Sequence, residues 1–252
     1  MRDLGSTVLE AVNHILQYHP HLAQSIRELA DSAYGNNRAE QKFHGLHGLD
    51  EKLTRWLNYD GGYFVELGAN NGIDQSNTLY FERLHNWKGL LVEPTPHNFL
   101  SCRKHRSPET KVYCNACVSF DYGEKFVEIA YSNLMSAPLG VESDIGDPLD
   151  HAETGKQFLR PTDQVFTFGA VAITLNDLLV KAHAPKVIDL LSLDVEGGEI
   201  EVLKGIDHNV YRFKFMCVEN RDFDKLSAYM DTIQYKFVEK LSPNDYLFAS
   251  SL

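Results

Sequence analysis

The chain has 252 residues, of which 43% are hydrophobic and 23% are charged, and these proportions are ordinary for a globular protein. This length suits one α/β domain with an extension better than two full domains. The 24 basic residues against 35 acidic ones give a formal charge of −11, which counts against nucleic acid as a partner, because phosphate binding depends on clustered cations. A basic run at 103–106 is interpreted as the solvated end of a helix.

The first 40 residues predict a helical extension. Thr7 and Glu10 form a capping box, and Pro20 separates two apolar stripes that have helical spacing. We expect residues 1–40 either to cap the main domain or to form a homodimer contact, and the sequence does not choose between these roles. No apolar block typical of a signal peptide or a transmembrane helix occurs, so a cytoplasmic protein is expected.

Strand-like and helix-like patterns alternate from residue 63 onward. The predicted helices are 76–85, 97–105, 174–182, 199–206 and 222–230. The predicted strands are 63–68, 89–94, 111–119, 125–132, 187–195, 213–220, 235–242 and 245–251, of which 125–132 is expected to be antiparallel. This alternation predicts a doubly wound, mainly parallel, Rossmann-like α/β sheet over residues 41–252, closed by an antiparallel C-terminal hairpin.

Residues 133–168 do not fit the alternation. The segment holds three prolines and three glycines and shows little periodicity, so we expect no regular element in it. Loops of this length in compact domains are usually functional or disordered. We interpret residues 133–168 as an insertion that covers the mouth of the active site, and a disordered surface loop is the alternative.

Four cysteines are present, and two of them form a C-x-x-C at Cys114 and Cys117. If residues 111–119 form one strand, positions three apart point to opposite faces, so these two thiols cannot share a metal ion. We therefore expect all four cysteines to be reduced thiols, as in a reducing compartment.

A glycine-rich turn follows the strand at 63–68. The spacing Gly68-x-x-x-Gly72 lets the backbone turn tightly and approach a ligand, although it is not the G-x-G-x-x-G of dinucleotide-binding domains. Glu93 ends the next strand, 21 residues after Gly72, close to the spacing at which a carboxylate binds ribose hydroxyls. The alternative for Glu93 is a strand-end carboxylate that faces water.

Five segments together resemble the FkbM family of S-adenosylmethionine (SAM)-dependent methyltransferases. They are FVELGANNG (64–72), WKGLLVEP (87–94), NACVS (115–119), ITLNDL (173–178) and LSLDVEGGE (191–199). The resemblance runs from about Gly48 to Leu252 and implies a SAM site. The residues that it places against SAM are Glu66, Gly68, Asn70, Gly72, Asp74, Ser76, Asn77 and Thr78, with Glu93 on the ribose and Ala116 and Val118 beside the adenine.

Acidic residues also follow two later strands. Asp194 and Glu196 lie two positions apart, and Glu219-Asn220 ends the next strand, so these oxygen donors are expected to meet at one edge of the sheet. Hard oxygen ligands suit Mg²⁺, and Asp194, Glu219 and Asn220 are the candidate ligands. The pattern is similar to that of the metal-dependent macrocin-type sugar O-methyltransferases, although Asn220 stands where they have a second acid. The alternative is that Asp194 and Glu219 cap helices or bind substrate hydroxyls without a metal.

The family resemblance implies O-methylation of a hydroxyl group on a sugar, a glycan or another small metabolite. Asp194 would hold Mg²⁺ or the acceptor hydroxyl, and Glu196 would take the acceptor proton. Two alternatives stay open, namely a catalytically silent SAM-fold protein that serves interaction and an RNA methyltransferase.

Overall fold

The computed structural model describes residues 42–159 and 163–251. The helical extension predicted for residues 1–40, and the homodimer contact considered for it, lie outside the described residues. Phe43 is the first residue of a structural unit that continues to the C-terminus and contains the site.

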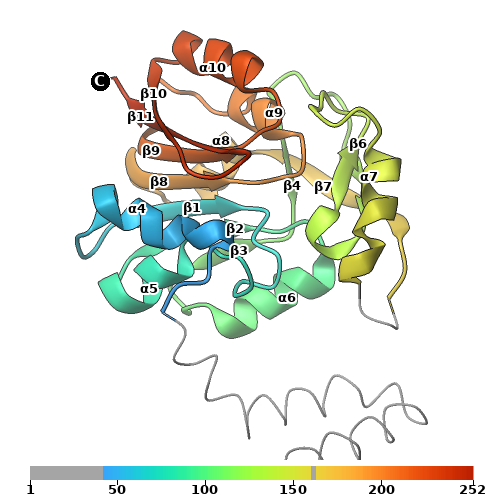
Figure 1. The fold of residues 1–252 in the computed structure, drawn as a ribbon, viewed down its shortest axis with the longest axis horizontal. Coiled ribbons are helices and arrows are strands. Elements are labelled where there is room, and N and C mark those ends of the chain that lie inside the picture. Colours follow the sequence, from blue (N-terminus) through green and yellow to red (C-terminus); the bar gives the residue numbers. More distant parts are fainter. Residues whose placement is uncertain (1–41, 160–162, 252) are drawn as a thin grey trace, which may run out of the picture. The chain divides into compact units, whose positions relative to one another are not determined.

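A seven-stranded sheet forms the centre of this unit, in the order β10-β11-β9-β8-β1-β2-β3 (Figure 1). The five strands from β9 to β3 are parallel, whereas β11 runs antiparallel to both of its neighbours. The predicted doubly wound, mainly parallel sheet with an antiparallel C-terminal hairpin is therefore confirmed. The strands are β1 (Tyr63–Leu67), β2 (Lys88–Val92), β3 (Lys111–Tyr113), β8 (Val187–Leu193), β9 (Arg212–Glu219), β10 (Tyr235–Lys240) and β11 (Asp245–Ser250).

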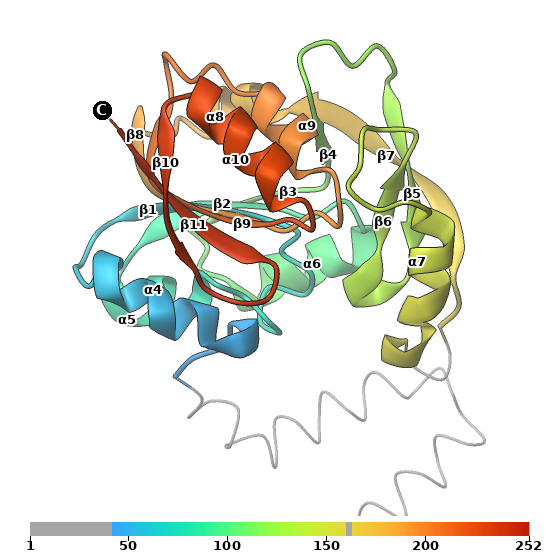
Figure 2. The same cartoon turned by 45° about the horizontal axis from the view of Figure 1, so that its top comes forward.

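Helices cover both faces of this sheet, because successive side chains of each strand point to opposite sides. Phe64 of β1 packs into one apolar cluster and Val65 into the other. The Phe64 cluster is covered by α4 (Leu49–Leu57), which follows a 3-10 turn (Leu46–Gly48), and by α5 (Leu79–His85) and α6 (Pro96–His105). The Val65 cluster is covered by α8 (Leu175–Lys181), α9 (Glu199–Lys204) and α10 (Phe223–Thr232), as Figures 1 and 2 show.

A second sheet, in the order β4-β7-β5-β6, was not expected. The prediction of a single strand over 111–119 is wrong, because the strand conformation is interrupted at Cys114-Asn115. Its first part is β3 in the main sheet, and its second part pairs with β7 in the second one. The antiparallel strand predicted for 125–132 is confirmed. The strands are β4 (Ala116–Val118), β5 (Phe126–Tyr131), β6 (Ala137–Leu139) and β7 (Phe166–Thr174).

The expectation of no regular element in residues 133–168 is also wrong. Its described part contains 3-10 turns at Asn133–Met135 and Gly155–Phe158, strand β6, and helix α7 (Pro148–Thr154), and β7 starts within it. Helix α7 begins after Asp147, whose side chain accepts hydrogen bonds from two N–H groups of the first turn. Strands β6 and β7 both pair with β5, and the partners in β7 lie 35 to 45 residues from those in β5, a long-range contact that leaves no periodic pattern in the local sequence.

Candidate active site

The chain turns sharply where β1 ends. Gly68 has a φ of +76°, and a β-carbon there would lie 1.7 Å from the carbonyl oxygen of Asp194. Only glycine allows this turn so close to the end of β8. Gly72 also has a positive φ, but it packs against Cys102 of α6 and shapes the turn from behind.

Glu93 follows β2 and connects the ends of two neighbouring strands. Its buried carboxylate accepts a hydrogen bond from the backbone N–H of Asn70 at 2.9 Å and one from that of Thr95 at 2.8 Å. Removal from water raises the pKa of Glu93 to about 7, against the opposing effect of these hydrogen bonds. Glu93 is therefore a fixed, desolvated carboxylate beside the glycine turn and not a strand-end group facing water.

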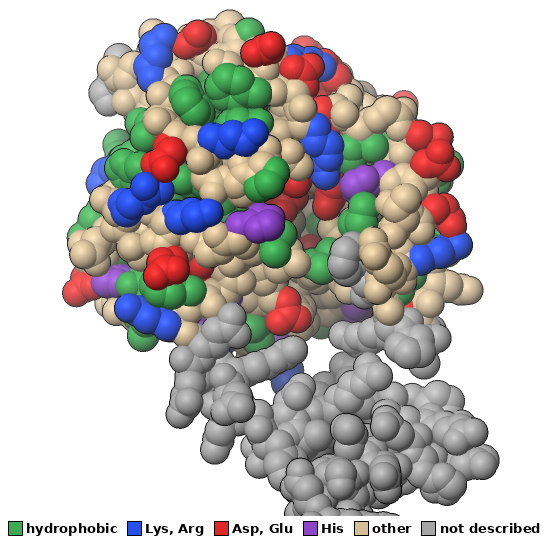
Figure 3. Space-filling model, viewed as in Figure 1, with side chains coloured by type: hydrophobic (Ala, Val, Ile, Leu, Met, Phe, Trp, Pro, Cys, Tyr) green, Lys and Arg blue, Asp and Glu red, His purple; other side chains and the backbone are tan. Residues whose placement is uncertain are grey.

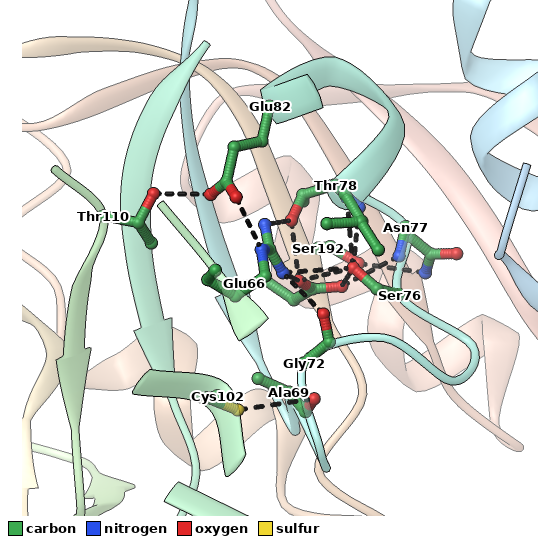
Figure 4. A network of polar contacts seen from close by, with 12 residues as sticks. Glu66, Ala69, Gly72, Ser76, Asn77, Thr78, Glu82, Cys102, Thr110 and Ser192 are labelled. Atoms are coloured by element: carbon green, nitrogen blue, oxygen red, sulfur yellow. Dashed lines mark hydrogen bonds and ion pairs between the residues drawn. The ribbon is translucent and has the colours of Figure 1, made fainter. Parts of the chain in front are cut away.

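Glu66, by contrast, belongs to a buried polar network (Figure 4). Its carboxylate accepts hydrogen bonds from the Ser76 and Thr78 hydroxyls, at 3.0 Å and 2.6 Å to the same oxygen, and from the backbone N–H of Asn77 at 2.8 Å. The Arg106 guanidinium lies 3.1 Å from the same carboxylate. Glu66 thus fixes the backbone that leads into α5.

This network changes the interpretation of the start of α5. The backbone N–H groups of Asn77 and Leu79 bond to Glu66 and to the Ser76 hydroxyl, so these donors are used inside the protein and not left for a SAM carboxylate. The Asn77 amide donates to the Ser192 hydroxyl at 3.1 Å. The structure therefore places Asn77 and Thr78 behind the site as supports for its wall.

Arg106 corrects the interpretation of the basic run at 103–106. Its side chain is fully buried, and its guanidinium lies 3.1 Å from Glu66 and 3.2 Å from Glu82. It also donates to the Thr78 hydroxyl at 2.8 Å. The run is therefore not a solvated helix end throughout, because its last residue neutralises two buried carboxylates.

A cavity of about 410 Å³ opens at the carboxyl ends of the parallel strands. Its walls come from the glycine turn, the end of β2, the second sheet and residues 133–151. Pockets of this size commonly hold small molecules, and this sheet edge is where doubly wound proteins bind ligands. The predicted cofactor residues that line it are Glu66, Gly68, Asn70, Asp74, Ser76, Glu93, Ala116 and Val118, whereas Gly72, Asn77 and Thr78 lie outside its lining.

Three carboxylates that line this cavity meet where β8 and β9 end. Carboxylate oxygens of Asp194, Glu196 and Glu219 all lie within 4.8 Å of one another. Desolvation and then the charges of Glu219 and Glu196 raise the pKa of Asp194 well above its ordinary value. Desolvation and the Glu219 charge raise the pKa of Glu196 to about 7. Acidic side chains also line a hollow on the face shown in Figure 3.

The backbone at Glu196 is held in a rare conformation. Its φ of +56° lies in the left-handed region, which non-glycine residues seldom adopt. The buried Glu199 carboxylate accepts hydrogen bonds from the N–H groups of Val195 and Gly197, at 3.0 Å and 3.1 Å, on either side of Glu196. Desolvation raises the pKa of Glu199 to about 8. Glu199 thus fixes the turn that presents Glu196 to the cavity.

Arg221 places a cation among the acids. Its guanidinium lies 2.7 Å from Glu196, 3.5 Å from Glu219 and 3.6 Å from Asp144. The Nε2 atom of His151, on α7, lies 2.9 Å from the same Glu196 oxygen. Asp144 and His151 both belong to residues 133–168, so this segment contributes directly to the acidic end of the cavity.

The residues present do not fit the Mg²⁺ site predicted from Asp194, Glu219 and Asn220. Asn220 lies outside the cavity lining, and its amide oxygen accepts the N–H of Asp222 at 2.9 Å. Glu196 joins Asp194 and Glu219 in its place, but Arg221 already lies within ion-pair distance of Glu196 and Glu219. A guanidinium there supplies the positive charge that a metal ion would bring.

Sequence comparison settles the family. The family model described as "Methyltransferase FkbM domain" matches residues 66–238. This chain belongs to the FkbM methyltransferase family. The match spans the glycine turn, Glu93 and the acidic cluster, so both ends of the cavity lie within the FkbM domain. No curated protein matches the chain significantly.

Several solved structures resemble this FkbM-family chain at low sequence identity. A TehB-like SAM-dependent methyltransferase from Corynebacterium glutamicum is 10% identical, with 93% of this chain and 99% of that chain covered and a TM-score of 0.42. A human methyltransferase 10 domain containing protein is 12% identical, with 81% of each chain covered and a TM-score of 0.40. A precorrin-6y C5,15-methyltransferase from Geobacter metallireducens is 10% identical, with 80% and 85% covered and a TM-score of 0.39.

Four residues of this site were not found from the sequence. Arg221 directly follows Asn220 and Glu199 lies three positions after Glu196, and a positive charge after Glu219-Asn220 was a readable signal. His151 and Asp144 gave no signal, because they reach the site through the packing of a segment without periodicity.

In the described part of the chain, no helix is both long and apolar enough to cross a membrane.

Proposed function

We propose that this FkbM-family protein transfers the methyl group of SAM to a hydroxyl group of a sugar, a glycan or another small metabolite. The observation that carries the proposal is that one cavity is lined by the glycine turn and Glu93, here called its first end, and by the acidic cluster of Asp194, Glu196 and Glu219, its second end, and that Gly68 packs against the Asp194 carbonyl between them. A methyl donor and its acceptor need these two ends side by side.

The first end suits SAM. Gly68 lets the chain turn tightly against the carbonyl group of Asp194, and this turn brings the backbone of Gly68 and Asn70 to the cavity wall. The fixed carboxylate of Glu93 is proposed to accept hydrogen bonds from the ribose hydroxyls. Ala116 and Val118 of the second sheet give an apolar wall for adenine, and Gly68, Asn70, Asp74 and Ser76 line the rest of this end. When bound, SAM supplies an electrophilic methyl group on a positively charged sulfur.

The second end suits an acceptor hydroxyl. Asp194 is proposed to accept a hydrogen bond from that hydroxyl and so to orient its oxygen. Glu196 supplies a negative charge that favours removal of the hydroxyl proton, and Glu199 holds the turn that carries Glu196. Methyl transfer from a sulfonium needs positioning and proton removal more than covalent help, and both tasks fall to residues on this chain.

The test is methyl transfer from radiolabelled SAM into fractionated sugar nucleotides, glycans and small metabolites. Incorporation into a hydroxyl-bearing fraction, lost in Glu196→Gln, is the expected result. Incorporation into RNA would support the RNA methyltransferase alternative, which the charge of −11 disfavours. Tight SAM binding without any transfer would support a silent interaction protein.

Arg221 and Mg²⁺ are competing cations for the acidic cluster, and we propose that Arg221 is the resident one. Its ion pairs with Glu196 and Glu219 support this choice. Methyl transfer that survives EDTA and does not respond to added Mg²⁺ is expected. Loss of activity in EDTA, with recovery on Mg²⁺, would reverse the assignment.

Two further points concern the protein as a whole. We propose that residues 133–168 close over bound ligands, since several residues of that segment line the cavity, among them Met135, Val141 and His151.

We also propose a cytoplasmic location, because all four cysteines are free thiols, which a reducing compartment maintains. Fluorescence microscopy of the tagged protein tests the location.

A further inference from the structure

One histidine faces the acceptor end of the cavity and contacts the proposed catalytic carboxylate. His151 of α7 lines the cavity, and its Nε2 lies 2.9 Å from Glu196 Oε2. We propose that His151 is the catalytic base, taking the acceptor proton on Nδ1 while Glu196 holds Nε2–H and stabilises the imidazolium. This inference rests on the proposed methyl transfer and names the group that first accepts the proton.

The contact fixes which ring nitrogen is available. A neutral imidazole has one N–H and one lone pair, so an Nε2–H donated to Glu196 leaves the lone pair on Nδ1. None of the residues in the described ranges hydrogen-bonds Nδ1. The two side chains are 15% and 14% exposed, so the pair is sheltered but reachable from the cavity.

Glu196 is less suited to take the proton itself. Its Oε2 atom receives both the Arg221 Nη2–H, at 2.7 Å, and the His151 contact. Arg221 favours the ionised form of this carboxylate, against the desolvation and the Glu219 charge that raise its pKa to about 7, and the two donors already occupy Oε2. The same ion pair keeps a negative charge against the imidazole, which stabilises the imidazolium once His151 is protonated. An acid that orients and stabilises a basic histidine is a recurrent catalytic arrangement.

Burial favours the neutral form of His151. Burial and the Arg221 charge lower the pKa of His151 below its ordinary value of 6.5, while the Asp144 charge opposes them. His151 is therefore unprotonated near neutral pH and able to accept a proton. Glu219 also lies near the pair, since its carboxylate is within 4.8 Å of that of Glu196 and within 3.5 Å of the Arg221 guanidinium.

The step balances with SAM as the only co-reactant. The acceptor O–H bond breaks as its proton moves to Nδ1 of His151, and the oxygen electron pair forms the new O–CH₃ bond. The bond between the methyl carbon and sulfur breaks, and its electrons stay on sulfur as a neutral thioether. The imidazolium then releases its proton to solvent, which restores the base.

The position of His151 links catalysis to residues 133–168. Asp144 of the same segment accepts the backbone N–H of Arg221 at 2.6 Å and donates its own N–H to the Gly197 carbonyl at 3.2 Å. These contacts fix the segment to the turn that carries Glu196. The pairing of His151 with Glu196 therefore depends on this segment lying against the site.

The first test compares His151→Ala with Glu153→Gln, a control at an exposed position of the same helix, where Glu153 forms an ion pair with Lys156. With the first acceptor that the wild type methylates in the radiolabel screen, His151→Ala should lower kcat by about 10²- to 10⁴-fold and leave the Kd for SAM unchanged. Added imidazole should restore part of the rate, which it cannot do for a residue that only supports the fold. The control should retain wild-type kcat. Unchanged kcat in His151→Ala, or loss without imidazole rescue, would overturn the assignment.

The second test needs no acceptor. In ¹⁵N-histidine-labelled protein with S-adenosylhomocysteine, long-range ¹H–¹⁵N spectra at pH 8 should show that His151 is protonated on Nε2 and unprotonated on Nδ1. Its signals are assigned by their loss in His151→Ala. A proton on Nδ1 would overturn the proposal even if methyl transfer is confirmed. If no acceptor is methylated, the proposed function fails, and this spectrum still decides the state of the pair.

Discussion

Replacing Arg106 by methionine tests how the wall behind the SAM end is held. Methionine has a similar length and no charge, so the change removes the cation and keeps most of the volume. It leaves Glu66 and Glu82 without their common partner, and the side chains of both are almost fully buried, with exposed fractions of 5% and 6%. The Thr78 hydroxyl also loses the guanidinium N–H that lies 2.8 Å away.

Breaking a buried ion pair by removing one partner costs about 3–5 kcal/mol, because the remaining charge stays desolvated. For a protein of this size, each kcal/mol lowers the melting temperature by about 2–4 °C. Arg106→Met should therefore lower the melting temperature by about 6–20 °C in calorimetry or fluorescence unfolding. Adding Glu82→Gln should recover part of the loss, since it removes one of the two uncompensated charges.

The matched control is Arg103→Met, an exposed position of α6 three residues before Arg106, where the guanidinium lies over the Phe99 ring at 5.8 Å. An exposed substitution of this kind should change stability by less than about 0.5 kcal/mol. Equal melting temperatures for the two variants would refute the argument, because they would mean that the buried carboxylates of Glu66 and Glu82 do not need the Arg106 charge.

Three other expectations concern the acidic end. Glu199 ordinarily ionises near pH 4.5, and burial raises its folded pKa to about 8, so its ionisation in the unfolded chain reduces stability as the pH rises through that window. Glu199→Gln should therefore gain on the wild type in unfolding experiments from pH 5 to 8, by up to about 1.4 kcal/mol per pH unit, and a constant difference would contradict this. Glu196→Gln should keep the SAM affinity and lose about 10²- to 10⁴-fold in turnover, so full activity would exclude a catalytic role. Hydrogen exchange in residues 133–159 should slow when acceptor binds, and equal exchange rates would count against closure.

The main sheet was readable from the sequence because its signals are local. Mostly apolar runs such as 187–193, in which Asp189 and Ser192 are the polar residues, mark strands buried on both faces, and the glycine turn and Glu93 follow their strands directly. The second sheet was not readable, since β4 and β7 pair across more than 50 residues and β4 has only three residues. No short window of sequence encodes such a pairing.

The site shows the same division. Asp194, Glu196 and Glu219 were placed together because parallel strands end at one edge of a sheet. Arg106 was misread as solvated, because its charge says nothing of the two carboxylates that α5 and β1 bring to it. His151 reaches Glu196 from 45 residues away, and only the folded chain reveals that contact.

SAM binding at Glu93 is the central claim, and calorimetry on cofactor-free protein tests it most directly. The wild type should bind S-adenosylhomocysteine with measurable heat. Glu93→Ala should weaken that binding by about ten- to a hundred-fold, as expected for loss of about 1.5–3 kcal/mol from hydrogen bonds to a charged group. Glu109→Ala, which changes an exposed carboxylate paired with Lys88, should bind like the wild type. Absence of heat with the folded wild-type protein, or equal affinities for the wild type and Glu93→Ala, would contradict the account.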